Sequence, residues 1–179
     1  MSSDTDAELR RRVDAALREI GASPDLPAER GLAFFADATE LALAHVSRSG
    51  REHFLIPAAA GSWRRMRTEA EADGVTLVMI SGYRGFDRQL EIIRERLAEG
   101  LHIDAVLSAL APPGCSEHHS GRAADVGTPG CEPLSEAFER TRAFEWLDAR
   151  AGEFGFRLSY PRDNSMGYRY EPWHWCFTP

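Results

Sequence analysis

The segment SEHHSGRAAD, residues 116–125, places two adjacent histidines, a glycine and an aspartate in and just before a short apolar stretch. His118 and Asp125 are seven positions apart, and Gly121 between them permits a tight return of the chain, because glycine readily adopts positive φ. The pattern predicts a loop that leads into a short strand and presents both side chains to one point. Adjacent side chains of an extended chain point to opposite sides, so only one of His118 and His119 is expected to face that point.

A second polar motif, Glu-Pro-Trp-His ending at His174, can complete a metal site with the first. Catalytic zinc takes three protein ligands from His, Asp or Glu and keeps one position for water. His118, Asp125 and His174 therefore form a candidate ligand set, provided that the strand carrying His174 lies beside the strand carrying Asp125. Glu171 precedes His174 by three positions, which would let its carboxylate accept a proton from a water that zinc activates.

Each of these residues also has an ordinary structural interpretation. A histidine and an aspartate at this spacing occur in many proteins that bind no metal there. His174 lies between two tryptophans and could be a core histidine, and Glu171 could be an ion-paired carboxylate. The other histidines, His45, His53 and His102, lack a matching partner and are interpreted as structural.

Hydrophobic periodicity predicts an α+β fold. Apolar residues recur at helical spacing in residues 4–20, 28–46, 58–72, 86–99 and 135–154. Short apolar runs bounded by turn residues predict strands over residues 75–80, 123–126, 156–160 and 173–177. Because the helices gather early in the chain and the strands late, we expect a small antiparallel sheet that holds the zinc site and is covered by helices largely from the N-terminal half.

The length of 179 residues and a hydrophobic fraction of 43% fit a single domain with a substantial core. We divide it into a helical N-terminal extension, residues 1–56, and a catalytic core, residues 57–179. Three cysteines are too few for a disulfide framework. A monomer or a weak dimer is expected.

The charge balance and hydropathy exclude several classes of protein. A formal net charge of -7 argues against a nucleic-acid partner. No apolar run approaches the ~20 residues of a transmembrane helix. Residues 1–12 are polar and lack the apolar region of a secretory signal. A cytoplasmic location is therefore expected, or the periplasm or cell wall if a signal has been removed.

A third motif, SGYR at residues 81–84 followed by Gln89, completes a family pattern. Together with S-x-H-x-x-G-x-A-x-D from Ser116 and E-x-W-H from Glu171, it resembles the VanY-type zinc D-alanyl-D-alanine carboxypeptidases. D-Ala-D-Ala dipeptidases and some phage endolysins belong to the same metallopeptidase group. The resemblance covers roughly residues 57–177, and three motifs in the right order make it specific. One departure is the C-terminal end, where WCFTP replaces the aromatic-Arg-Tyr-Val-Gly run of many members.

The resemblance implies a role for each matching residue. It implies that zinc is bound by His118, Asp125 and His174. It implies that Glu171 acts as catalytic base and then acid, and that Arg84 holds substrate and stabilises negative charge on the scissile carbonyl. It further implies substrate contacts from Ser116, Gln89 and Tyr83.

The resemblance thus implies zinc-dependent hydrolysis of the C-terminal peptide bond of peptidoglycan stem peptides by activated water as the expected function. Within the same group, a D-Ala-D-Ala dipeptidase, with the free dipeptide as substrate, and an L,D- or L-Ala-D-Glu peptidase are the alternatives. A non-catalytic zinc-binding module on the same fold is a second class. A cysteine hydrolase using Cys115 is a third, although the chain lacks an orienting pattern for it.

Overall fold

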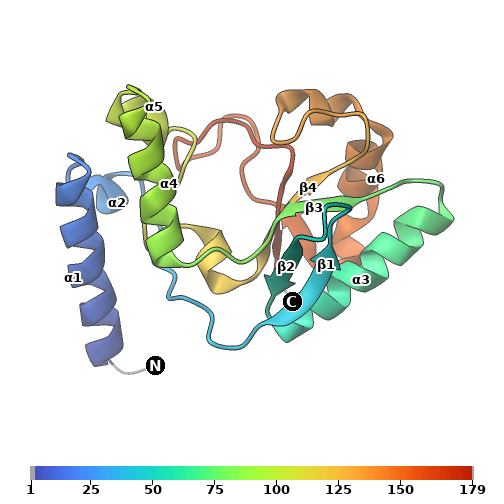
Figure 1. Cartoon of the computed structure of the whole chain (residues 1–179), viewed down its shortest axis with the longest axis horizontal. Helices are drawn as coiled ribbons and strands as arrows, with labels where there is room; N and C mark the ends of the chain where they lie inside the picture. Colours follow the sequence, from blue (N-terminus) through green and yellow to red (C-terminus); the bar gives the residue numbers. More distant parts are fainter. Residues whose placement is uncertain (1–2, 179) are drawn as a thin grey trace.

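A four-stranded antiparallel sheet with strand order β3-β4-β6-β5 lies at the centre of the protein (Figure 1). The computed structural model describes residues 3–178. The strands are β3 (Val78–Ser81), β4 (Ala123–Gly127), β5 (Phe156–Leu158) and β6 (His174–Phe177). Every residue of β4 and β6 is buried, because the two central strands are covered on both faces. The strands predicted at residues 123–126, 156–160 and 173–177 are confirmed, with ends shifted by one or two residues.

Two helices, α3 (Pro57–Ala72) and α6 (Arg142–Arg150), pack with the sheet into the main hydrophobic core. α3 begins with a proline, whose fixed φ suits the first helical position and whose missing N–H would have no partner there. Its buried face carries Trp63, Met66 and Ala70, at the spacing of one helical stripe. The helix predicted over residues 58–72 is therefore confirmed.

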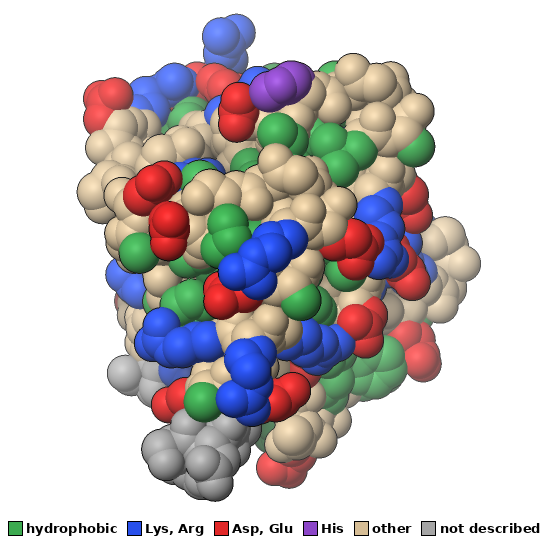
Figure 2. All heavy atoms as spheres, turned by 90° about the vertical axis from the view of Figure 1, so that its left-hand side faces the viewer, with side chains coloured by type: hydrophobic (Ala, Val, Ile, Leu, Met, Phe, Trp, Pro, Cys, Tyr) green, Lys and Arg blue, Asp and Glu red, His purple; other side chains and the backbone are tan. Residues whose placement is uncertain are grey.

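A second cluster of buried side chains joins α1 (Ser3–Glu19), α4 (Phe86–Ala98) and α5 (Ile103–Leu107). These helices lie at the opposite end of the molecule from α3 and α6 (Figure 1). On the face that they form, positive and negative side chains are interspersed (Figure 2), and ion pairs between α1 and α4 join Arg12 to Asp87 and Arg94 to Glu19. Arginines on this face thus serve helix-to-helix ion pairing. None of the described helices is long and apolar enough to cross a bilayer.

The helix predicted over residues 28–46 is wrong. Only α2 (Leu26–Glu29) is helical there, and a hairpin of β1 (Ala42–Val46) and β2 (Glu52–Leu55) follows it. Between α2 and β1 the chain has no regular secondary structure. It is held there by long-range hydrogen bonds from the Phe35 amide to the Gly114 carbonyl and from the Ala38 amide to the His119 carbonyl. These tertiary bonds outweigh the local helical periodicity. Division of the chain at residue 57 stays a prediction.

The helix predicted over residues 135–154 is interrupted. A 3₁₀ turn η2 (Glu136–Arg140) precedes α6, and a further turn η3 (Ala151–Phe154) follows it. Thr141 breaks the run, because its backbone is extended and its hydroxyl accepts a hydrogen bond from the Phe144 amide as an N-cap. The strand expected from residue 75 begins only at Val78. The five-residue helix α5 was not expected, because a single turn leaves no periodic signal.

Candidate functional site

A tight turn carries the adjacent histidines His118 and His119. η1 (Glu117–Ser120) is a 3₁₀ turn, and Ser116 is its N-cap. The Ser116 hydroxyl accepts a hydrogen bond from the His118 amide at 3.3 Å. Gly121 ends the turn with φ +66°, and a Cβ there would lie 3.0 Å from the Ile56 side chain. Glycine is therefore required for both the reversal and the close approach.

The return of the chain into β4 brings three polar side chains together. Asp125 is the register partner of His174 on β6, so the strand pairing itself sets their separation. The Asp125 Oδ2 atom lies 3.3 Å from His118 Nε2, and Oδ1 lies 3.1 Å from His174 Nδ1. One ligand atom from each of His118, Asp125 and His174 falls within 4.8 Å of the others, and all three residues are buried. We call these three residues the central cluster.

The two adjacent histidines face different partners. The His118 Nδ1–H donates to the Gly82 carbonyl at 2.7 Å, which leaves Nε2 free to face Asp125. His119 accepts from the Gly114 amide at Nε2 and donates from Nδ1 to the Arg84 carbonyl at 2.6 Å. Burial lowers the pKa of His119 to about 4, so its ring is neutral. With both ring nitrogens occupied, His119 supports the loop and lies outside the central cluster.

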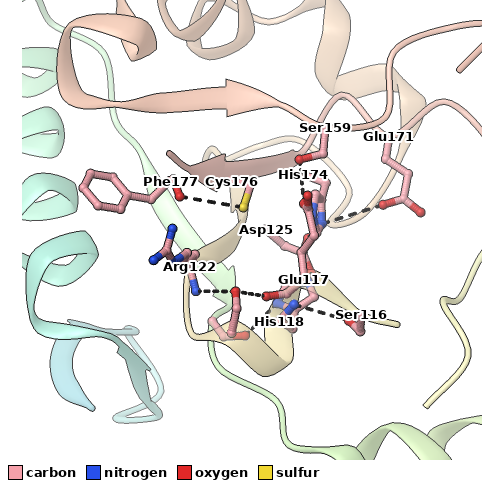
Figure 3. A network of polar contacts seen from close by, with 12 residues as sticks. Ser116, Glu117, His118, Arg122, Asp125, Ser159, Glu171, His174, Cys176 and Phe177 are labelled. Atoms are coloured by element: carbon pink, nitrogen blue, oxygen red, sulfur yellow. Dashed lines mark hydrogen bonds and ion pairs between the residues drawn. The ribbon is translucent and has the colours of Figure 1, made fainter. Parts of the chain in front are cut away.

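Glu171 lies beside the central cluster, in the turn that leads into β6 (Figure 3). Its Oε2 atom is 3.9 Å from His174 Nδ1, and the His174 amide donates to the Glu171 carbonyl. Burial raises the pKa of Glu171 to about 7, with the opposing charge of His174 only partly offsetting it. A carboxyl group with this pKa can both accept and release a proton near neutral pH.

Arg84 follows β3, is largely buried, and lies close enough to two acidic groups to interact with their charges. Burial lowers the pKa of its guanidinium, and the charges of Asp125 and Glu171 act in the opposite direction. Its Nε atom has no hydrogen-bond partner among the described residues. The buried guanidinium therefore retains donor capacity for an anionic group bound in the site.

A cleft of about 1110 Å³ opens onto these groups. Its walls include residues predicted from the sequence, namely Tyr83, Arg84, Ser116, His118, Asp125, Glu171 and His174. Three apolar side chains that are unusually exposed for their size, Phe54, Leu101 and Leu134, also line it. The cleft thus offers both polar and apolar contacts to a ligand.

The three predicted substrate contacts lie differently with respect to the cleft. Gln89 is fully buried outside the cleft lining, and its amide donates to the Ala111 carbonyl at 2.6 Å, so its position does not support the expected substrate contact. Ser116 lines the cleft, but its hydroxyl is engaged as the cap of η1. Tyr83 lines the cleft, and burial raises the pKa of its hydroxyl.

Glu117 is a site residue that the sequence reasoning missed. Its Oε2 atom accepts hydrogen bonds from His174 Nε2 at 2.9 Å and from the Ser159 hydroxyl at 2.6 Å (Figure 3). Although burial opposes ionisation, the His174 contact and the Ser159 bond lower the pKa of Glu117 to about 2. The only signal in the sequence was an acidic residue directly before His118, and that alone does not indicate which way it points.

Comparison with known proteins gives a family for this chain. The family model described as "VanY: D-alanyl-D-alanine carboxypeptidase" matches residues 52–179. A curated relative, the bifunctional D-Ala-D-Ala dipeptidase and carboxypeptidase VanXYC of Enterococcus gallinarum, is 33% identical over 138 residues, which are 73% of this chain and 70% of that protein. Three other curated relatives match at 34–36% identity, but this chain spans only 46%, 42% and 34% of their lengths.

Solved structures share the fold. The LdcB LD-carboxypeptidase, whose structure concerns peptidoglycan recognition, superposes with a TM-score of 0.69 at 32% identity over 79% of this chain and 69% of that one. A mutant of the vancomycin-resistance D,D-pentapeptidase VanY in complex with Zn(II) superposes with a TM-score of 0.62 at 29% identity. That match covers 78% of this chain and 79% of the other.

Proposed function

Because this chain belongs to the VanY family of D-alanyl-D-alanine carboxypeptidases, we propose that it is a zinc peptidase that hydrolyses the C-terminal peptide bond of peptidoglycan stem peptides. The observation that carries the proposal is the meeting of the central cluster, Glu171 and Arg84 at one cleft. A metal site, a proton carrier and an oxyanion partner are the three elements that such a hydrolysis needs.

The residues of the central cluster suit a zinc ion. Two imidazoles and one carboxylate are a donor set typical of catalytic zinc, and their ligand atoms already converge without rearrangement of the backbone. The ring nitrogens that face away from the cluster are held by the Gly82 carbonyl and the Glu117 carboxylate, as outer partners of zinc-bound histidines usually are. When bound there, zinc supplies Lewis acidity toward a carbonyl and lowers the pKa of water to about 7.

The chain's own residues then divide the remaining work. Glu171 accepts a proton from the attacking water and returns it to the departing amine, for which a pKa near neutrality is suited. Arg84 is a largely buried cation whose guanidinium stabilises the negative charge that develops on the scissile carbonyl oxygen, or holds the substrate's terminal carboxylate. Both groups are largely buried, which strengthens both effects because charges interact more strongly where the local dielectric constant is low.

The alternatives differ in the bond that is cut. A D-Ala-D-Ala dipeptidase activity is supported by the likeness to VanXYC, and an L,D-carboxypeptidase activity by the likeness to LdcB. A cysteine hydrolase is disfavoured, because burial raises the pKa of the Cys115 thiol to about 12 and leaves little thiolate. A non-catalytic zinc module is disfavoured by the presence of both Glu171 and Arg84.

The test is mass spectrometry of the zinc-loaded protein with a panel of stem peptides. The proposal expects release of one D-Ala from a pentapeptide ending in D-Ala-D-Ala. Cleavage of free D-Ala-D-Ala alone, or of a tetrapeptide alone, would replace it with the dipeptidase or the L,D alternative. No cleavage of any peptide, with zinc bound, would favour the non-catalytic module.

A further inference from the structure

We propose that Glu117 is a positioning residue that holds His174 with Nδ1 facing the central cluster and strengthens it as a metal ligand. This inference rests on the proposed zinc site. It concerns the side of His174 that faces away from Asp125, where the Glu117 carboxylate contacts Nε2 at 2.9 Å. Glu117 is not itself among the residues that line the cleft, and it contacts the ring nitrogen of His174 opposite the one that faces Asp125.

The contacts of His174 leave its ring one orientation. Nδ1 faces Asp125 at 3.1 Å, and Nε2 faces Glu117 at 2.9 Å. The Tyr160 ring packs against it with centroids 4.7 Å apart, and the His118 ring meets it edge-on at 5.0 Å. A flipped imidazole would lose both of its polar contacts at a position that is almost completely buried, which is costly.

Glu117 is itself fixed by a second set of contacts. The Ser159 hydroxyl donates to the same carboxylate oxygen at 2.6 Å, and the Ser159 amide donates to the His174 carbonyl at 3.3 Å. Ser159 therefore ties the carboxylate to the strand that carries its histidine. The backbone of Glu117 is held in the capped turn η1, which also carries His118. Glu117 contacts the His174 ring at Nε2, and the His118 ring meets the same ring edge-on.

The two histidines of the cluster have unequal outer partners. His118 donates to a neutral backbone carbonyl, whereas His174 faces a carboxylate. A hydrogen bond to an ionised partner is stronger than one to a neutral partner, and it increases the electron density on the opposite ring nitrogen. His174 is therefore the better electron-pair donor to a metal of the two histidines. The strength of this donation depends on the charge of Glu117.

The contribution of Glu117 to zinc binding can be measured as the zinc affinity of the full chain, determined by competition with a chromophoric chelator. Glu117→Gln keeps the shape and removes the charge, and it should weaken zinc binding by about 10–100-fold. Glu132→Gln makes the same change of net charge at an exposed position and should leave the affinity unchanged. Ser159→Ala, which removes only the support of the carboxylate, should give an intermediate loss. The visible spectrum of the Co(II)-substituted protein should change in Glu117→Gln and not in Glu132→Gln.

Equal zinc affinities and Co(II) spectra for Glu117→Gln and the wild type would overturn the inference. If Glu117→Gln fails to fold, Ser159→Ala decides, and a wild-type zinc affinity in that variant counts against it. Different results would contradict the proposed function: a wild-type protein that binds zinc and cleaves none of the stem peptides, or one that binds no zinc at all. The ratio of variant to wild-type affinity remains measurable in the first of these cases.

Discussion

Asp125 on β4 lies directly opposite His174 on β6, and their side chains meet with Oδ1 3.1 Å from Nδ1. Residues that are register partners on adjacent antiparallel strands are neighbours by construction. Two candidate ligands that are far apart in sequence are therefore held together by main-chain pairing and need no flexible loop. A site built on paired strands is more precisely held than one built on loops, which suits a zinc centre.

Replacement of Glu171 by glutamine should separate metal binding from catalysis. Glu171→Gln leaves His118, Asp125 and His174 in place, so zinc content should stay near that of the wild type. Peptide hydrolysis should fall by about 10²–10⁴-fold, because the amide cannot carry the proton. Zinc analysis and the rate of D-Ala release check the two halves, and retained turnover would remove Glu171 from its proposed role.

The adjacent histidines should respond differently to truncation. His118→Ala removes one candidate ligand and should abolish tight zinc binding. His119→Ala should retain zinc but lower the free energy of unfolding by about 1–3 kcal/mol, because it leaves the buried Gly114 amide without its partner and frees the Arg84 carbonyl. Metal analysis and urea unfolding of both variants make the comparison, and loss of zinc from His119→Ala would contradict the assignment.

Asp37 connects the N-terminal part of the chain to the site. The N-cap residue of α4 is Gly85, which has no side chain, and the Asp37 carboxylate instead accepts from the Phe86 amide at 2.9 Å, in the first turn of that helix. Asp37→Ala should reduce the free energy of unfolding by about 0.5–2 kcal/mol, the range seen when a side-chain acceptor at a helix N-terminus is removed. Chemical denaturation measures it, with the exposed Glu40→Ala as a control that should be near neutral.

The β1–β2 hairpin should weaken at acid pH. His45 and His53 are register partners with ring centroids 5.9 Å apart, and burial lowers the pKa of both, assisted at His45 by Arg67 and at His53 by Arg51. Since the folded pKa lies below the unfolded value of about 6.5, their stabilising contribution is present above that pH and is lost as the pH falls below it.

The test is the pH dependence of the urea midpoint between neutrality and mildly acid pH. His53→Gln should flatten this dependence relative to the wild type, because one of the two groups that take up protons on unfolding has been removed. An unchanged slope in His53→Gln would show that the hairpin histidines do not control it.

Much of the fold could be predicted from local patterns. The amphipathic stripe of α3, the apolar runs of β4 and β6, and the glycine at position 121 each carry a signal within a few residues. The segment between residues 28 and 46 could not be predicted this way, because its conformation is decided by hydrogen bonds to residues far along the chain, such as those from Phe35 and Ala38.

For the site, the sequence by itself predicted the candidate ligands, the candidate proton carrier and the candidate cation, because each lies in a motif of the VanY resemblance. The partners that hold His119 away from Asp125, the position of Gln89 outside the cleft and the contact of Glu117 with His174 are seen only in the folded protein. The physical reason is that the direction of a side chain in a turn or a buried helix depends on the partners that satisfy its polar atoms. Those partners lie on other elements, and only folding brings them together.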